Sequence, residues 1–135
     1  MANTIFVNLP VRDLQKSVAF FTHLGYGFKP QYSDETAACM IVDENIFVML
    51  LTVPKFASFT PKLIVDAATG TEVVTCLQVD ARDKVDTLVR KALEAGGSTY
   101  KEPQDRGFMY GHGYQDLDGH LWEIVYIDSA ALPKG

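Results

Sequence analysis

Glu123 is the side chain best suited to moving a proton. It lies in an apolar stretch near the C-terminal end, among Leu121, Ile124 and Val125. A carboxyl group buried in an aromatic cleft has a raised pKa, which suits it to general acid or base catalysis or to binding a hydrogen-bond donor of a ligand. The alternative interpretation is an ordinary half-exposed strand carboxylate that hydrogen-bonds to its neighbours.

His112 is the second candidate, because it lies between two glycines and two tyrosines in the stretch GFMYGHGYQD. Glycines allow close backbone approach, and Tyr110 and Tyr114 could line the wall of a pocket together with His112. If His112 met Glu123 across the hairpin, the two would form an acid/base pair. The alternative is a bulged strand with a solvent-facing histidine.

Arg106 precedes a glycine in a polar loop that also contains a proline. It either pairs with Asp105 or Glu102 at the surface or reaches the mouth of a ligand cleft, where its guanidinium group would bind an anion. The sequence contains no glycine-rich phosphate loop, Cys-x-x-Cys pair or Ser-His-Asp arrangement.

The bulk composition indicates one ordered domain. The chain has 135 residues, of which 47% are hydrophobic, and a net charge of -5. The negative charge argues against a nucleic-acid or anionic-membrane partner, and no apolar stretch approaches the roughly 18 residues that span a bilayer. The N-terminus lacks the pattern of a signal peptide. Cys39 and Cys76 lie in apolar stretches, so we expect two buried thiols in a reducing, cytoplasmic environment.

The hydrophobic pattern predicts the same series of elements twice. In the first half it predicts a strand over residues 5–9 that ends at Pro10, a helix over 14–24 capped by Asp13, a strand over 28–32, and a hairpin of 37–42 and 46–52. The buried stripe of that helix is expected at Leu14, Val18 and Phe21, with Phe20 as a further candidate. In the second half it predicts a strand over residues 72–79, a helix from Asp80 or Asp83 to residue 95, an extended piece over 98–101, and a hairpin of 108–115 and 120–127.

An internal repeat connects the two halves. Residues 11–13 (Val-Arg-Asp) echo residues 81–83 (Ala-Arg-Asp), and Gly25 echoes Gly96. Each half reads β-α-β-β-β, and two such units are needed because one alone leaves its sheet open. The predicted class is α+β, in a single domain of residues 1–135. Its parts are a first module at residues 4–53, a connecting segment at 54–70, a second module at 71–128 and a tail at 129–135.

Two stretches resemble a known superfamily. FVNLPVRDLQKSVAFFTHLGY (residues 6–26) resembles the opening strand and helix of the vicinal-oxygen-chelate superfamily, which includes glyoxalases, bleomycin resistance proteins and extradiol dioxygenases, and DLDGHLWEI (residues 116–124) resembles its closing hairpin. The chain from residue 5 to about 128 is similar to a bacterial branch of predicted lactoylglutathione lyases. The resemblance implies a curved mixed sheet around a small-molecule cleft, and a homodimer that covers sheet edges.

The resemblance also allows a test for a metal site. Metal-dependent members carry a His, Glu or Gln ligand on each of four strands, and these positions fall near Phe6, at Met49 or Leu50, at about Val74 and at Glu123. Only Glu123 is a residue of the required kind. Because a divalent ion needs several oxygen or nitrogen donors, the sequence predicts neither a metal nor another cofactor, and disfavours an extradiol dioxygenase.

Three functions stay open, because this superfamily hosts many reactions. The first is metal-free binding of a small, partly apolar organic molecule. The second is a lyase or isomerase resembling lactoylglutathione lyase, with Glu123 and His112 as acid and base. The third is a structural or interaction domain. We prefer the first two, and expect a cleft lined by Phe6, Asn8, Leu50, Tyr110, His112 and Glu123, with Tyr114 and Arg106 as further ligand contacts.

Overall fold

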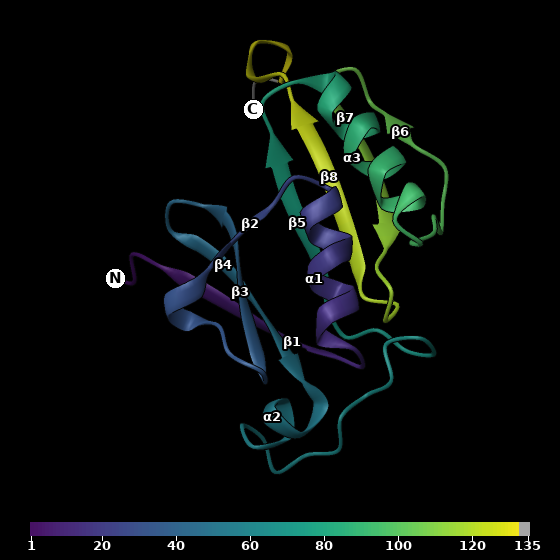
Figure 1. Cartoon of the computed structure of the whole chain (residues 1–135). Coiled ribbons are helices and arrows are strands. Elements are labelled where there is room, and N and C mark those ends of the chain that lie inside the picture. Colours follow the sequence, from purple (N-terminus) through teal and green to yellow (C-terminus); the bar gives the residue numbers. More distant parts are fainter. Residues whose placement is uncertain (133–135) are drawn as a thin grey trace. The chain divides into compact units, whose positions relative to one another are not determined.

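The computed structural model describes residues 1–132 (Figure 1). The chain divides into two compact units, Met1–Val65 and a second that begins at Asp66. Each unit contains one main helix and one four-stranded mixed sheet in the order β-α-β-β-β. The predicted α+β class with two βαβββ modules is therefore confirmed. No helix in residues 1–132 is both long enough and apolar enough to cross a bilayer.

The first unit is built on a sheet with the strand order β1-β4-β3-β2. Strand β1 runs parallel to β4, whereas β3 runs antiparallel to both β4 and β2. The elements of this unit are β1 (Ile5–Val11), α1 (Leu14–His23), β2 (Gly27–Lys29), the 3-10 turn η1 (Pro30–Tyr32), β3 (Ala37–Asp43), β4 (Ile46–Thr52) and the short helix α2 (Val53–Ala57).

Helix α1 begins where the sequence predicts it, because Asp13 caps its N-terminus. The Asp13 carboxylate accepts a hydrogen bond from the Lys16 backbone N–H at 3.1 Å. The helix contacts β3 and β4 and buries Phe20 and Phe21. Ser17 is buried in this helix, whereas the expected Val18 is only partly buried.

Two predicted strand boundaries are wrong, and proline explains both. Strand β1 continues through Pro10 to Val11. It lies at an edge of its sheet, where the missing N–H of proline need not cost a ladder hydrogen bond. The next strand stops at Lys29, because Pro30 starts the turn η1 instead of extending the strand to residue 32.

The second unit repeats this topology with the strand order β5-β8-β7-β6. Strand β5 is parallel to β8, and β7 is antiparallel to both β8 and β6. The elements are β5 (Val74–Val79), α3 (Arg82–Glu94), β6 (Gln104–Asp105), β7 (Met109–Gln115), β8 (Leu121–Ile127) and the turn η2 (Ser129–Ala131). The last residues of the predicted tail, 133–135, lie outside the described part of the chain.

Helix α3 packs on strands β7 and β8. Its N-cap is Ala81 and its first residue is Arg82, so the helix begins between the two expected aspartates, Asp80 and Asp83. Tyr114 and Trp122 are both fully buried, and their rings stack with centroids 6.2 Å apart.

The two cysteines differ in exposure. Cys39 is buried, as expected, but Cys76 is exposed. Cys76 lies on the edge strand β5, where alternate residues are exposed. The expectation of two buried thiols is therefore wrong for Cys76.

Candidate functional site

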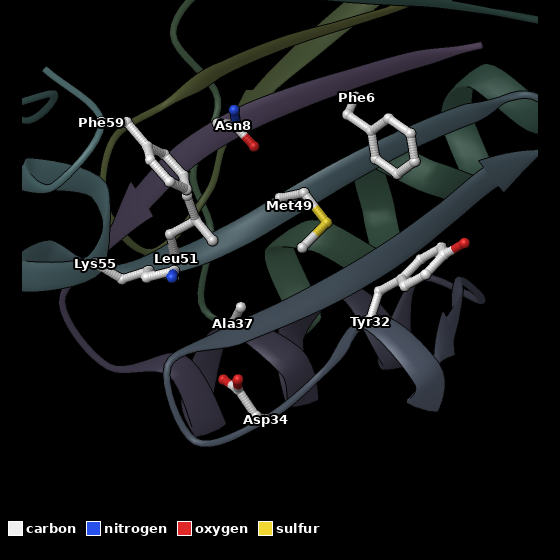
Figure 2. Close-up of a pocket in the computed structure, with 9 residues that line it drawn as sticks. All are labelled: Phe6, Asn8, Tyr32, Asp34, Ala37, Met49, Leu51, Lys55 and Phe59. Atoms are coloured by element: carbon white, nitrogen blue, oxygen red, sulfur yellow. The ribbon is translucent and has the colours of Figure 1, made fainter.

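A hollow of about 440 Å³ lies on the face of the first sheet that points away from α1 (Figure 2). Its volume is within the range of small-molecule sites, about 300–1,000 Å³. We call it the first-unit hollow. Its lining is mostly apolar and consists of Phe6, Asn8, Tyr32, Asp34, Ala37, Met49, Leu51, Lys55 and Phe59.

The pairing of β1 with β4 determines which side chains form the floor of the first-unit hollow. Across the parallel strands β1 and β4, Phe6 pairs with Phe47 and Asn8 pairs with Met49. The rings of Phe6 and Phe47 stack with centroids 5.0 Å apart. Because alternate strand residues share a face, Phe6 and Asn8 both line the hollow, and Figure 2 shows the side chains of Asn8 and Met49 extending into it. Two of the predicted ligand contacts thus lie in one hollow.

Leu50 does not line this hollow. It follows Met49 in β4 and therefore points to the other face of the sheet, where it is 0% exposed. A shift of one residue along a strand moves a side chain from one face to the other. Met49 therefore lines the hollow, whereas Leu50, which the sequence predicted in the cleft lining, is a core residue.

Several lining residues come from turns and a short helix outside the strands of the sheet. Tyr32 and Asp34 lie in and after the turn η1, and Lys55 and Phe59 lie in and after α2. The Lys55 Nζ atom lies 5.5 Å from the centroid of the Phe59 ring. For Lys55 and Phe59, the sequence signal that could have found them is the aromatic residues of the connecting segment.

Asp34 places an anion at the rim of the hollow. The hydroxyl group and the backbone N–H of Thr36 both donate to Asp34 Oδ1, each at 2.7 Å. These hydrogen bonds lower the pKa of the Asp34 carboxyl group. The rim thus offers the negative charge of Asp34 and the positive charge of Lys55 to a polar part of a ligand.

In the second unit, Glu123 lies in the middle of β8, between Cys76 on β5 and Gly113 on β7. Its side chain is 18% exposed, and its Oε1 atom lies 2.5 Å from Lys101 Nζ. Lys101 precedes β6 in the polar segment beside the edge of the sheet. Glu123 is thus a half-buried carboxylate paired with a single ammonium group.

His112 lies on the other face of the same sheet. It pairs with Ile124, which is 0% exposed, whereas the next residue, Gly113, pairs with Glu123. The His112 Nε2 atom lies 3.1 Å from the backbone oxygen of Lys101. The predicted acid/base pair of His112 and Glu123 is not formed in this sheet, because adjacent residues of a strand point in opposite directions.

The two tyrosines beside His112 face helix α3. The Tyr110 hydroxyl group donates to Asp86 Oδ1 on α3 at 2.6 Å, and Tyr114 is fully buried against Trp122. Neither tyrosine therefore shares a face with Glu123, and both belong to the packing of α3 on its sheet.

Arg106 lies in the exposed loop before β7. Its backbone N–H donates to the Met109 oxygen at 2.8 Å. Asp105, one of the two carboxylates expected to pair with it, instead forms an ion pair with Arg82.

Tyr100 and Gly113 complete the surroundings of Glu123, and the sequence did not single out Tyr100. A Cβ atom built on Gly113 would lie 2.5 Å from Glu123 Oε2 and 2.6 Å from the Tyr100 hydroxyl oxygen. Burial, followed by the charge of Glu123, raises the pKa of Tyr100 well above its usual range. A phenol group and a carboxylate therefore converge on the space left by the missing side chain of Gly113.

The residues present do not fit the metal site that the superfamily resemblance suggests. The four positions that the resemblance assigns to metal ligands hold Phe6, Met49 or Leu50, Val74 and Glu123. These positions supply one carboxylate, and that carboxylate already contacts Lys101. Zinc sites use three or four protein ligands, so this set does not match a metal site.

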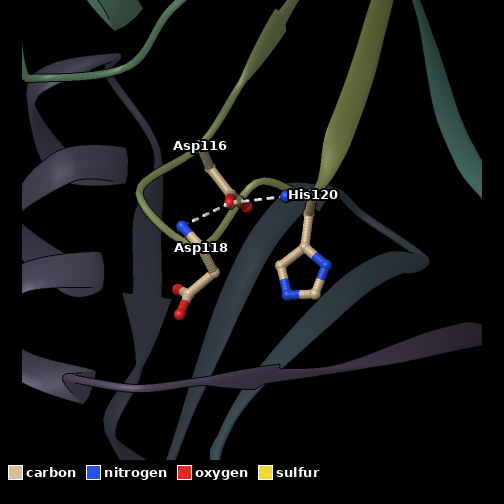
Figure 3. A group of neighbouring side chains, drawn as sticks. All are labelled: Asp116, Asp118 and His120. Carbon is tan, nitrogen blue, oxygen red and sulfur yellow. Dashed lines mark hydrogen bonds between the residues drawn. The ribbon is translucent and has the colours of Figure 1, made fainter. Parts of the chain in front are cut away.

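A second group of possible metal ligands lies in the turn between β7 and β8 (Figure 3). Asp116 Oδ1 accepts hydrogen bonds from the backbone N–H groups of Asp118 and His120, each at 3.0 Å, and Asp116 Oδ2 accepts from Trp122 Nε1 at 3.0 Å. Burial raises the pKa of the Asp116 carboxyl group. These contacts assign Asp116 the role of holding the turn and anchoring the core tryptophan.

Comparisons with known proteins agree with this architecture. A family model described as bleomycin resistance protein-like N-terminal matches residues 4–42, and no curated protein matches the chain. A hypothetical protein from S. aureus is similar in structure, with a TM-score of 0.79 and 28% identity over 93% of this chain and 94% of that one.

Two named structures show the same fold at lower identity. A glyoxalase/bleomycin resistance protein/dioxygenase family enzyme from Burkholderia phytofirmans PsJN has a TM-score of 0.74 and 19% identity, over 93% of this chain and 99% of that one. The fosfomycin resistance protein FosX from Listeria monocytogenes has a TM-score of 0.67 and 17% identity, over 93% of each chain. The duplicated module, its strand order and these matches show that the chain has the fold of glyoxalase/bleomycin resistance proteins, and its residues 4–42 match the bleomycin resistance protein-like family model.

Proposed function

We propose that the protein binds a small, largely apolar organic molecule in the first-unit hollow and does so without a metal ion. The observation that carries this proposal is the hollow itself, whose apolar wall includes Phe6, Met49 and Phe59. The positions where metal-dependent relatives would carry ligands in this unit hold Phe6 and Met49 or Leu50, and the ring of Phe6 stacks on that of Phe47. An aromatic wall favours a flat ligand, because ring faces stack with offset geometry.

The polar groups of the hollow narrow the ligand class. The Asn8 amide group lies among apolar residues and can both donate and accept a hydrogen bond. Lys29 Nζ lies 4.9 Å from the Phe47 ring centroid and 5.2 Å from that of Tyr32, so a positive charge lies beside these two aromatic rings. We infer an aromatic or heteroaromatic compound with a carbonyl, amide or acidic group. The names of the matching family model and of the Listeria structure, both resistance proteins to organic drugs, support a ligand of this kind.

Binding of the fluorescent probe anilinonaphthalene sulfonate, which is aromatic and anionic, tests this proposal. The fluorescence titration compares the wild type with Phe6→Ala and Met49→Ala. Ile5→Ala is the matched control, because Ile5 is exposed on the same strand but does not line the hollow. We expect about tenfold weaker binding in each hollow variant, equal to about 1.4 kcal/mol, and unchanged binding in the control and in the presence of a chelator. Equal affinity in all four proteins would contradict the proposal.

A second candidate function, proton transfer by Glu123, is supported by a different observation. Glu123 is 18% exposed and contacts Lys101 on the face of its sheet that points away from α3. A lyase or isomerase resembling lactoylglutathione lyase would need such a base. His112 is not part of this candidate mechanism, because it lies on the other face.

The proposal includes a homodimer. Strands β1 and β5 each lie at an edge of their own sheet, and Ile5 and Val74 are exposed there. Exposed apolar edge strands are commonly covered by pairing. Light scattering of the purified protein measures the mass directly, and a monomeric mass would remove this part of the proposal.

A further inference from the structure

The two ends of the first-unit hollow differ in chemistry. At one end, Ala37 of β3 pairs with Leu51 of β4, and both residues line the hollow. The backbone N–H of Asp34 donates to the oxygen of Ala37 at 2.8 Å, and Lys55 lies in α2, which directly follows β4. Figure 2 shows both charged side chains near this strand pair and Phe6 at the opposite end of the hollow. We call the end that holds Asp34 and Lys55 the charged end.

The two charges of the charged end have no ion-pair partner among residues 1–132. Both hydrogen bonds that Thr36 donates to Asp34 use Oδ1, so Oδ2 can accept a donor from a ligand. These hydrogen bonds and, to a smaller extent, the charge of Lys55 lower the pKa of the Asp34 carboxyl group, which is therefore ionised at neutral pH. The Lys55 ammonium group lies over the ring of Phe59 and keeps N–H donors for a ligand.

The pairing of the strands determines how far the charged end lies from the aromatic end. Along β4, Leu51, Met49 and Phe47 share one face of the sheet. Asn8 of β1 pairs with Met49, and Phe6 pairs with Phe47. Alternate residues of a strand are roughly 7 Å apart, so the Asn8 amide group lies one such step from the charged end and the Phe6 ring lies two steps from it. A charged group joined to a flat ring by one or two carbon atoms would place that ring over Asn8 and Met49, with its edge toward Phe6.

We propose that the ligand is an aromatic α-amino acid whose ring carries a hydrogen-bonding group. Asp34 binds the ammonium group of this ligand, Lys55 binds its carboxylate group, and the Asn8 amide group binds the polar atom of its ring. This inference rests on the first function proposed above and narrows its ligand class.

The charge pattern favours this class over simpler aromatic compounds. An α-amino acid carries both charges on one carbon atom, so it can pair with both charged side chains at once. An aromatic amine would leave Lys55 without a partner, and an aromatic acid would leave Asp34 without one. Hydrogen bonds between charged groups are stronger than those between neutral groups, so the missing pair should be measurable as lost affinity.

Three compounds with the same ring test this match by isothermal titration calorimetry. L-Tryptophan carries both charges, tryptamine lacks the carboxylate group, and indole-3-propionate lacks the ammonium group. The variants are Asp34→Asn, which keeps an oxygen atom to accept from Thr36, and Lys55→Met. The matched controls are Glu35→Gln and Lys62→Met, which remove exposed charges from the same two segments without changing the lining of the hollow.

We expect the wild type and both controls to bind L-tryptophan about fivefold more tightly than either analogue, the size of one exposed ion pair. Asp34→Asn should bind L-tryptophan and indole-3-propionate equally. Lys55→Met should bind L-tryptophan and tryptamine equally. Circular dichroism checks that each variant is folded.

Two results would overturn this inference. One is a wild-type affinity for L-tryptophan no greater than for the two analogues, and the other is an unchanged preference for L-tryptophan in both variants. If Phe6→Ala still weakens the binding of anilinonaphthalene sulfonate, the first proposed function stands without this ligand class. If Phe6→Ala weakens the binding of none of the four compounds, both proposals are overturned.

Discussion

Glu123 on β8 and His112 on β7 lie on opposite faces of the second sheet, although the two strands are paired and His112 directly precedes Gly113, the partner of Glu123. Glu123 pairs with Gly113 and contacts Lys101, whereas His112 pairs with the buried Ile124. The hairpin therefore brings the two backbones close together, but the two side chains point to opposite faces of the sheet. The partner of the carboxylate is a lysine from the segment beside the sheet edge.

The first prediction separates these two residues. Glu123→Gln keeps the size of the side chain and removes its charge, so we expect a folded protein that has lost proton exchange. His112→Gln should leave the exchange rate within about threefold of the wild type, because its side chain does not reach the face of Glu123. Proton NMR in D₂O, which follows the loss of the methylene signal of hydroxyacetone, measures both rates, and an equal loss in the two variants would contradict the assignment of faces.

The second prediction concerns two neighbouring residues of β4. Leu50 is fully buried, so Leu50→Ala should lower the free energy of unfolding by about 2–5 kcal/mol. Met49→Ala should weaken probe binding in the first-unit hollow with a smaller effect on stability, because Met49 is only partly buried. Urea unfolding and fluorescence titration of the two variants check this contrast. A reversed result would mean that β4 presents the other face to the hollow.

The third prediction uses the glycine beside Glu123. A Cβ atom on Gly113 would lie 2.6 Å from the backbone oxygen of Trp122 and from the Tyr100 hydroxyl oxygen. Gly113→Ala should therefore lower the free energy of unfolding by about 1–3 kcal/mol and abolish proton exchange. Gly27→Ala is the control, because a Cβ atom there has nothing within 4 Å. Similar unfolding midpoints for both variants in urea would show that the space over Gly113 can adapt.

The fourth prediction concerns alkaline pH. Burial raises the pKa of Tyr26 from 10.0 to about 12, and its ring lies 6.2 Å from that of Phe21. The folded state holds this proton more tightly than the unfolded state. The stability from Tyr26 is therefore complete below pH 10 and is lost as the pH rises to about 12, by roughly 2–3 kcal/mol.

Tyr26→Phe tests this assignment, because phenylalanine has no proton to lose. Urea unfolding at several pH values should give a shallower loss of stability in the variant than in the wild type between pH 10 and pH 12. Absorbance titration of the folded proteins should show one late-ionising tyrosine fewer in the variant. Parallel stability curves for the two proteins would assign the alkaline loss to other groups.

The order of elements was available from the sequence, because local rules control it. The Asp13 cap, the glycines after both main helices and the Asp-Gly turn before β8 act over a few residues. The repeat of this order in the two halves, together with the opening and closing stretches, was enough to predict the duplicated βαβββ fold. The errors at Pro10 and at residues 30–32 lie at element ends, where sheet position decides whether proline is tolerated.

The composition of the candidate sites depended on tertiary structure. The side chains of a strand alternate with a period of two, so one position decides whether Met49 or Leu50 lines the first-unit hollow and whether His112 or Gly113 faces Glu123. No local pattern relates Lys101 to Glu123, because their contact arises only when the segment beside β7 folds against the sheet. The sequence therefore determined which elements form and in which order, whereas strand pairing determined which side chains meet.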